Sequence, residues 1–202
     1  MTAEPADELG GRLPLANPAA LTGEQRALFD RMMARIVPWA DEAGFASTAD
    51  GRMIGPFNPA LLNPSVTASM LDLSVAERTH TSLSDRVREV VILAVGAVWR
   101  ADYEVYAHVA LARTAGLSER AARMIATGAE PDELDESETI AQRLTTALSV
   151  AHRVDDDLYR QAEEAFGAQG LVDIAFLIGI YHSVCAVLNL FSIPAPGQVP
   201  HS

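Results

Sequence analysis

Two carboxylates and an imidazole stand at spacings that allow acid–base chemistry. Glu104 and His108 are four residues apart, and Glu89 lies fifteen residues before Glu104 in an apolar run. Side chains four residues apart share one face of a helix, so the Glu104 carboxylate can hold the tautomer of His108 and raise its basicity. A buried carboxyl group tends to have a raised pKa, which suits Glu89 for general acid–base work. These three residues are the candidate catalytic residues.

The position of a helix break decides whether Glu89 can meet the other two residues. On one straight helix, the fifteen residues to Glu104 correspond to a rise of about 22 Å, which prevents direct contact. Residues 99–102, Trp-Arg-Ala-Asp, are typical of a junction between helices. If the chain turns there, two helices can pack back to back and bring the three side chains together.

Each candidate also has a simpler structural interpretation. A Glu–His pair at this spacing is often a surface pair, and Glu89 can be a partly exposed residue at a helix start. His182 lies on the last apolar helix, where we expect a hydrogen-bonded core histidine rather than a ligand. Metal binding is weakly indicated, because Glu104 and His108 have no obvious third and fourth ligands. The sequence has no glycine-rich phosphate loop and no Gly-x-Ser-x-Gly motif.

Helical periodicity runs through nearly the whole chain, and no segment alternates with the period of a strand. Several expected helices begin at a capping residue, for example Thr22, Ser84 and Asp102. Residues 87–98 are apolar on most sides and should be buried. We expect helices over residues 22–38, 64–79, 84–99, 102–115, 118–128, 140–151, 155–167 and 171–191. Short connections between them predict an all-α bundle of about eight helices.

The composition is that of one globular domain. The 202 residues can bury a sizeable core, and 49% of them are hydrophobic. Residues 1–20, rich in Pro, Gly, Ala and Glu, are expected to form a flexible arm. The formal net charge of −12, with no run of Lys and Arg to offset it, argues against binding to nucleic acid or to an anionic membrane.

The single cysteine, Cys185, can form neither an intrachain disulfide nor a Cys-x-x-Cys motif, and we expect it to be a small buried hydrophobe. The N-terminus has no signal-peptide pattern, so a cytoplasmic protein is expected. Residues 171–191 are long and apolar enough to span a bilayer, but they contain Asp173, His182 and Asn189, which are costly at membrane depth. A buried central helix is therefore the expected role of this segment.

Two stretches carry a resemblance to a known family. Residues 88–95 read Arg-Glu-Val-Val-Ile-Leu-Ala-Val, and residues 103–108 read Tyr-Glu-Val-Tyr-Ala-His. Together they resemble the core of the carboxymuconolactone decarboxylase family, within the alkylhydroperoxidase D (AhpD)-like superfamily. Residues 179–194 are similar to the C-terminal helix of the family and the segment after it. The resemblance implies an arm at residues 1–20, an AhpD-like helical domain at 21–197 and a tail at 198–202.

Redox members of this superfamily carry a Cys-x-x-Cys pair at a helix start, with a glutamate upstream and a histidine downstream. In this chain Ala101 and Glu104 stand where the two cysteines would be. Glu89 and His108 match the other two positions. Because the thiol nucleophile is missing, the resemblance argues against thiol peroxidase chemistry.

The resemblance implies a lyase without metal or organic cofactor, which decarboxylates a small carboxylated lactone or a related activated carbonyl compound. In this scheme His108 is the principal acid and base, Glu104 orients it or shares its proton, and Glu89 is a second proton relay. The pocket residues expected are Arg100 for a substrate carboxylate, with Tyr103, Tyr181, His182 and Asn189.

Two other functions remain open at this point. A hydro-lyase or isomerase acting on a different ring substrate would use the same residues, and a non-catalytic helical oligomer could keep the fold without the chemistry. The family further implies a homo-oligomer, either a trimer or a hexamer.

Overall fold

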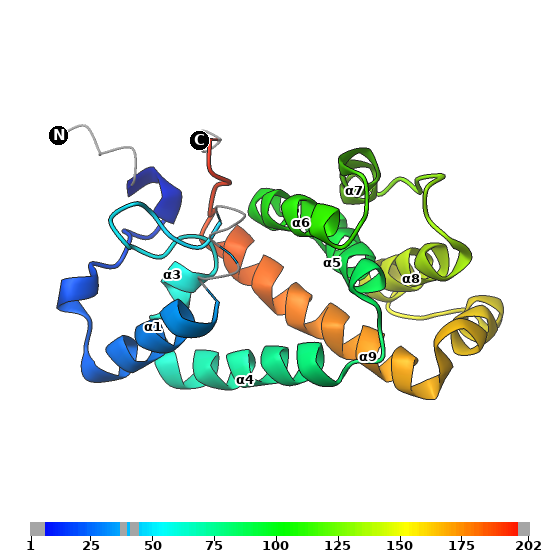
Figure 1. Cartoon of the computed structure of the whole chain (residues 1–202), viewed down its shortest axis with the longest axis horizontal. Coiled ribbons are helices and arrows are strands. Elements are labelled where there is room, and N and C mark those ends of the chain that lie inside the picture. Colours follow the sequence, from blue (N-terminus) through cyan, green and yellow to red (C-terminus); the bar gives the residue numbers. More distant parts are fainter. Residues whose placement is uncertain (1–6, 37–39, 41–44, 198–202) are drawn as a thin grey trace. The chain divides into compact units, whose positions relative to one another are not determined.

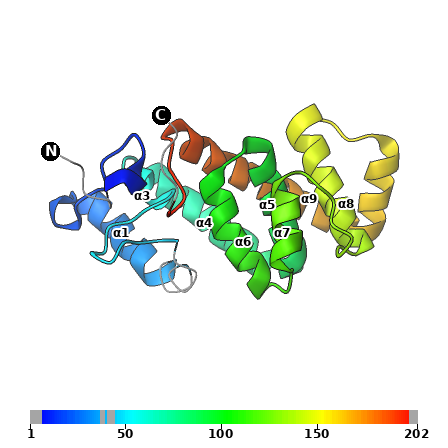
Figure 2. The same cartoon turned by 90° about the horizontal axis from the view of Figure 1, so that it is seen from above.

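The computed structural model describes residues 7–36, 40 and 45–197. The regular structure of this part of the chain is helical, apart from one isolated β-bridge between Ser47 and Met53. Its α-helices (Figures 1 and 2) are α1 (Gly23–Arg35), α3 (Phe57–Ala60), α4 (Pro64–His80), α5 (Asp85–Trp99), α6 (Asp102–Thr114), α7 (Glu119–Ala126), α8 (Glu136–Thr146) and α9 (Asp156–Leu190). The predicted all-α class is therefore confirmed. The helix end expected at Pro38, the first six residues of the expected arm and the expected tail lie outside the described residues.

The chain forms two compact units. Residues 74–185 make one, here called the core unit, and residues 1–73 with 186–202 make the other, here called the terminal unit. In the terminal unit, the predicted cap Thr22 forms a capping box with Gln25 at the start of α1. The buried Asn58 side chain accepts from the Ala16 N–H at 2.9 Å and donates to the Pro14 carbonyl at 3.2 Å. These bonds tie residues 14–16 to the body of the terminal unit.

Helix α5 is the centre of the core unit. Ten consecutive residues, Val87–Gly96, are buried, as expected for a helix that is apolar on most sides. On one side α5 packs against α8 and α9 through residues such as Ile140 and Ile174. On another side it packs against α6 and α7 through residues such as Val109 and Ile125. Any side chain that α5 presents toward α6 therefore lies in the interior of the unit (Figure 2).

The junction between α5 and α6 breaks the chain where the sequence predicted. Arg100 ends α5 in the left-handed region, at φ 50° and ψ 45°, and Ala101 is extended at φ −88°. Ala101, not Asp102, is the N-cap residue of α6, so the predicted capping role of Asp102 is wrong. Asp102 is instead the first helical residue, where its negative charge still interacts favourably with the helix dipole. The break lets α6 fold back along α5.

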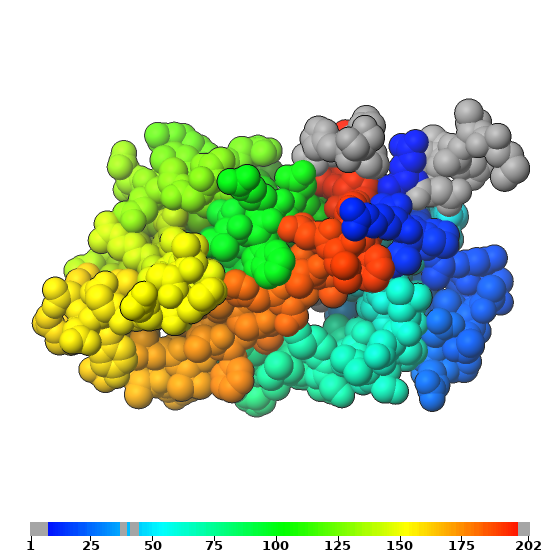
Figure 3. Space-filling view, turned by 180° about the vertical axis from the view of Figure 1, so that it is seen from behind, coloured from blue at the N-terminus to red at the C-terminus, as the bar shows by residue number. Residues whose placement is uncertain are grey.

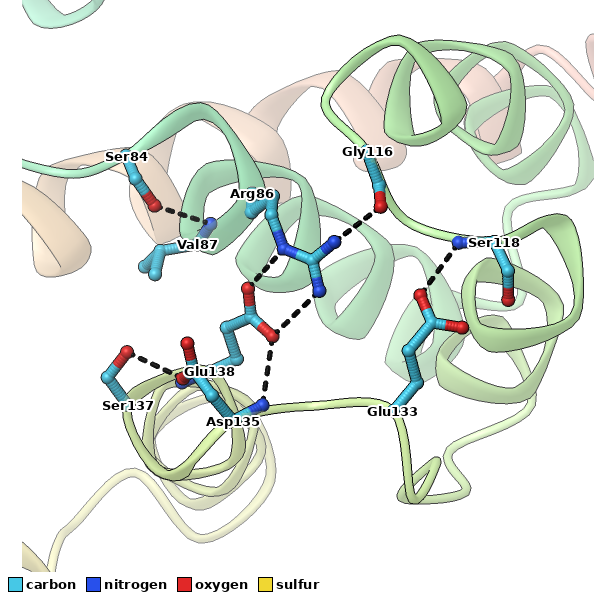
Figure 4. Close-up of polar contacts among 9 residues, drawn as sticks. All are labelled: Ser84, Arg86, Val87, Gly116, Ser118, Glu133, Asp135, Ser137 and Glu138. Atoms are coloured by element: carbon cyan, nitrogen blue, oxygen red, sulfur yellow. Dashed lines mark hydrogen bonds and ion pairs between the residues drawn. The ribbon is translucent and has the colours of Figure 1, made fainter.

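A partly buried ion pair ties the starts of α5 and α8 to the loop between α6 and α7 (Figure 4). Arg86 donates from Nε to Glu138 Oε1 at 2.6 Å and from Nη2 to Glu138 Oε2 at 3.1 Å. The same guanidinium donates to the Gly116 carbonyl. Glu138 Oε2 also accepts from the Asp135 N–H at 3.0 Å, which completes a capping box at the start of α8. One bidentate contact thus fixes three segments of the core unit.

Helix α8 ends earlier than the sequence predicted. The apolar stripe suggested one helix over residues 140–151, but α8 stops at Thr146 and the chain continues as a π-helical turn, Ala147–Ala151. His152 then closes the turn in the left-handed region, at φ 57°. A π-turn is wider than an α-turn and often occurs at functional sites. It lies directly before the loop that leads into α9.

Helix α9 joins the two helices expected over residues 155–167 and 171–191. The only non-helical backbone inside it is Gly167, at φ 63° and ψ 175°, which is the predicted end of the first helix. The apolar half is long enough to cross a membrane by length and composition, with a mean hydropathy of 2.1 over its most apolar window, yet only 33% of that window is buried. The expectation of a buried central helix is therefore wrong for one face of α9, where Val172 (52% exposed) and Phe176 (57% exposed) point outward. Figure 3 shows the orange atoms of α9 along the surface.

Candidate functional site

The three candidate catalytic residues meet inside the core unit. His108 Nδ1 on α6 lies 2.8 Å from Glu89 Oε2 on α5, and His108 Nε2 lies 3.1 Å from Glu104 Oε1. All three residues are buried. The helix break at Arg100 makes this contact possible, since Glu89 and His108 come from two helices packed side by side. The structure therefore contains the cluster that the spacing of these residues predicted.

The two carboxylates hold the imidazole unequally. The bond between Glu89 Oε2 and His108 Nδ1 has hydrogen-bond geometry. Glu104 Oε1 lies close enough to Nε2 for an ion pair, but the atoms are not aligned for a hydrogen bond, and this buried oxygen has no other donor in the described part of the chain. Glu89 is thus the firm partner of His108, while the Nε2 edge of the ring is less tightly engaged.

His108 carries a proton at neutral pH in this environment. Burial disfavours the charged imidazolium, but the Glu89 and Glu104 carboxylates outweigh it and raise the pKa of His108 to about 10. Both ring nitrogens then carry a proton, and each faces a carboxylate. A histidine in this state can donate a proton to a bound molecule, and it becomes a base only after that proton has left.

Tyr181 is the expected pocket residue that lies against this cluster. Its ring meets the His108 ring edge to face, with centroids 5.1 Å apart and planes at 88°. Burial, and then the Glu104 and Glu89 carboxylates, raise the pKa of the Tyr181 phenol well above its usual value. Tyr181 is therefore a neutral hydroxyl group beside a charged imidazolium.

Two charged residues of the site were missed by sequence reasoning. Arg88 on α5 forms an ion pair with Glu77 on α4, and both side chains are only 6% exposed. Both act on the pKa of Tyr181, which Arg88 lowers and Glu77 raises. The only signal in the sequence was an arginine next to Glu89 inside an apolar run, and an arginine there needs a buried acidic partner. The partner, Glu77, comes from another helix, so the spacing of residues along the sequence could not identify it.

The other expected pocket residues are placed differently. Arg100 is exposed and has no hydrogen bond or ion pair with any described residue. Tyr103 is 2% exposed and packs near Tyr106, with ring centroids 6.2 Å apart. Asn189 belongs to the terminal unit. The contacts described here do not connect Arg100, Tyr103 or Asn189 with the cluster around His108.

His182 is a hydrogen-bonded histidine, as its surroundings on the apolar helix predicted. The Trp99 indole N–H donates to His182 Nδ1 at 2.8 Å, and His182 Nε2 lies 2.9 Å from the Ser149 hydroxyl in the π-turn. An indole nitrogen can only donate, so Nδ1 is the acceptor and the ring proton is on Nε2. Nε2 then donates to Ser149 and cannot take its proton. Ser149 and His182 are therefore not a nucleophile and its base.

Neither a metal centre nor a thiol centre stands out in the described residues. No group of three His, Cys, Asp or Glu side chains among them is arranged to hold a metal ion. Glu89 and Glu104 face opposite edges of the His108 ring, so they do not converge on one point. Cys185 is fully buried, and burial raises the pKa of its thiol. A thiol kept protonated in this way is a poor nucleophile.

Part of the chain matches the model of a known family. Residues 64–153, which carry Glu77, Arg88, Glu89, Glu104 and His108, match the model of the carboxymuconolactone decarboxylase family. No curated protein sequence matches the chain. Tyr181 lies outside the matched residues.

Several solved structures are similar in fold. An uncharacterised peroxidase-related protein from Ralstonia eutropha with an AhpD core has a TM-score of 0.74 at 18% identity, over 96% of this chain and 95% of that one. A putative antioxidant defence protein AhpD from Agrobacterium tumefaciens has a TM-score of 0.64 at 20% identity, over 70% and 97%. The debrominase Bmp8, in complex with 2,3,4-tribromopyrrole, has a TM-score of 0.66 at 12% identity, over 86% and 88%. These likenesses confirm the predicted AhpD-like fold.

Proposed function

We propose that this chain, in which residues 64–153 form a carboxymuconolactone decarboxylase family domain on an AhpD-like fold, is a cofactor-free lyase. Its substrate would be a small carboxylated lactone or a related activated carbonyl compound, from which it removes carbon dioxide. The observation that carries the proposal is the buried imidazole of His108, which is hydrogen-bonded at Nδ1 to Glu89 and only loosely engaged at Nε2.

For this reaction the protein must supply a proton at carbon, orient the substrate and stabilise the enolate. As the bond between the substrate and its carboxylate breaks, the electron pair moves through the conjugated system onto the lactone carbonyl oxygen, and carbon dioxide leaves. The enolate that remains takes a proton at carbon, and His108 Nε2 is placed to give it. Solvent then returns a proton to the imidazole.

The geometry favours a different division of labour from the one that the sequence suggested. Glu89 makes the well-formed bond to Nδ1, so it is the residue that orients His108. Glu104 faces Nε2, the nitrogen that would give up its proton, so it stabilises the imidazolium before the reaction. Thiol redox chemistry is not favoured, because the chain has one cysteine and that cysteine is buried.

The test is a turnover assay on 4-carboxymuconolactone, followed by absorbance, with a chelator present and no cofactor added. We expect the wild-type protein to turn over the lactone and His108→Gln to lose at least about 100-fold in kcat, the usual contribution of a general acid. Glu119→Gln is the matched control, since Glu119 is an exposed glutamate paired with Arg123 on α7. If His108→Gln kept full turnover, the proposed role of His108 would be wrong.

Absence of turnover in the wild-type protein would reject the decarboxylation of this lactone. The two alternatives then have different signatures. A hydro-lyase or isomerase would convert another unsaturated ring carbonyl compound in a His108-dependent reaction, whereas a non-catalytic oligomer would convert none of a panel of such compounds.

The uncovered face of α9 supports the further proposal that the chain forms a homo-oligomer, a trimer or a hexamer. Within the core unit the exposed positions of the apolar half of this helix are all uncharged, namely Val172, Ala175, Phe176, Gly179 and Ser183. An apolar face of this kind on a protein surface marks an interaction site. A second copy of the chain is the proposed occupant.

A further inference from the structure

We propose that the hydroxyl group of Tyr181 is the hydrogen-bond donor that stabilises the oxyanion of the reaction. This inference rests on the proposed function and adds a catalytic residue to it. Tyr181 belongs to α9 and lies outside the residues that match the family model. The site would thus be built from three helices, with Glu89 on α5, His108 on α6 and Tyr181 on α9.

The position of Tyr181 fits this role. Its ring lies edge to face against the His108 ring, with 5.1 Å between centroids, so the phenol is a direct neighbour of the imidazole. The side chain is partly buried. Its hydroxyl group makes no hydrogen bond to any residue that the structure describes, whereas Tyr159 at the other end of the same helix donates to Glu163. The Tyr181 hydroxyl is therefore available to a bound molecule.

The charges around Tyr181 keep it a donor. Burial, and then the carboxylates of Glu104, Glu89 and Glu77, disfavour a phenolate, whereas the Arg88 guanidinium favours one. A neutral hydroxyl group in a site that excludes water can donate to a developing oxyanion without reorganisation at the moment of reaction. The same carboxylates that keep His108 protonated thus keep Tyr181 protonated, and the two groups have separate tasks.

The two tasks follow one another in the reaction. While carbon dioxide leaves, the electron pair of the broken bond collects on the carbonyl oxygen, which accepts the Tyr181 hydrogen bond. Tyr181 keeps its proton throughout. When the enolate collapses, its carbon takes the proton of His108 Nε2, and the hydrogen bond from Tyr181 weakens as the carbonyl is restored.

Turnover of Tyr181→Phe tests the role in the reaction. Removal of one oxyanion donor lowers kcat by about 100-fold, and because the bond strengthens only as charge develops, KM should change little. Tyr159→Phe is the matched control on the same helix, at an exposed position, and should leave both constants unchanged. Circular dichroism and a melting curve verify that each variant is folded. An unchanged kcat in folded Tyr181→Phe overturns the inference.

Binding of 4-nitrophenol tests the donor without any reaction. Its anion is a planar ring with one oxyanion and absorbs differently from the neutral phenol, so the affinity for each form can be measured by titration. We expect Tyr181→Phe to weaken binding of the anion by about 10-fold, as loss of one charge-assisted hydrogen bond would, and to leave the neutral form unaffected. Equal anion affinity in wild type and variant, or no binding of the anion by the wild type, overturns the inference.

The two experiments separate failure of this inference from failure of the proposed function. Lactone turnover that needs His108 but not Tyr181 leaves the lyase proposal intact and rejects the donor role. Tyr181-dependent binding of the anion without turnover of the lactone supports the donor role and rejects the proposed substrate.

Discussion

Two histidines of the core unit, His108 and His182, are held in opposite protonation states by their surroundings. His108 lies between two carboxylates, which overcome the effect of burial and raise its pKa to about 10. His182 accepts from the Trp99 indole at Nδ1, and burial followed by the charge of His152 lowers its pKa. Both rings are fixed by hydrogen bonds, but one is fixed as a cation and the other as a neutral ring. Only the first can serve as a proton donor at neutral pH.

The Trp99–His182 contact should make the core unit sensitive to acid. Protonation of His182 places an N–H on Nδ1 against the indole N–H, so the bond must break. A lowered pKa means that the folded state disfavours the proton, so this stability is present above the ordinary histidine pKa of about 6.5 and is lost as pH falls below it. We expect the fluorescence of Trp99 to change in that range. The measurement uses a Trp39→Phe background, because Trp39 is the other of the two tryptophans in the sequence.

His182→Gln provides the control for this titration. Glutamine has no titrating ring, so the fluorescence change below about pH 6.5 should disappear if His182 causes it. A change that persists in His182→Gln would assign the acid sensitivity to another group.

The sequence predicted the members of the cluster better than their roles. The spacing of Glu104 and His108 predicted their contact, because one helix turn fixes it. Whether Glu89 or Glu104 holds the imidazole depends on differences of a few tenths of an ångström between helices, which no spacing rule gives. The Glu77–Arg88 pair was missed for a related reason, since it depends on how α4 packs on α5.

At the level of helices, the starts and breaks that depend on a few neighbouring residues were predicted correctly. Features that depend on packing between helices were not. Ser84 caps α5, and the chain breaks after Trp99, as local sequence predicted. The π-turn after Thr146 has no local signal, because the apolar stripe continues through it. The Ser149–His182 bond across to α9 offers a physical reason for a wider turn there. Long-range contacts of this kind override the regular period.

The bidentate Arg86–Glu138 contact should be costly to break from one side. Arg86→Met leaves the nearly buried Glu138 carboxylate without its guanidinium partner and also removes the bond to the Gly116 carbonyl. Because Arg86 is itself about a third exposed, we expect a loss of about 2 kcal/mol in the free energy of unfolding rather than the larger value of a fully buried pair. Urea denaturation followed by circular dichroism measures it.

Arg143→Met is the matched control for this prediction. Arg143 makes a similar two-bond contact with Glu130, but both side chains are about half exposed. Water can replace the lost partner there, so the expected loss is about 0.5 kcal/mol. Equal losses in the two variants would mean that the Arg86 contact does not hold the helix ends together.

For the whole molecule, the outer face of α9 is uncharged and exposed, and the packing of a single chain does not explain why. A chain with a net charge of −12 exposes an uncharged run along its most apolar helix. The same helix presents Tyr181 to the cluster on its other side. Coverage of α9 by a second copy would therefore also fix the helix that supplies the proposed oxyanion donor.

Replacement of Phe176 by glutamate should dissociate such an assembly. Phe176 is 57% exposed in the single chain, and a charge at this position would have to be buried against an apolar face if a second copy covers it. Light scattering after gel filtration should give three or six times the chain mass of 21.6 kDa for the wild type and the mass of one chain for Phe176→Glu. Tyr159→Glu, at an exposed aromatic residue before the Gly167 break, should keep the wild-type mass.

A wild type that is monomeric, or a Phe176→Glu variant that keeps the full mass, would show that this face of α9 is not the interface. If dissociation also lowers turnover while Tyr159→Glu does not, the assembly is needed to hold α9, and with it Tyr181, against His108.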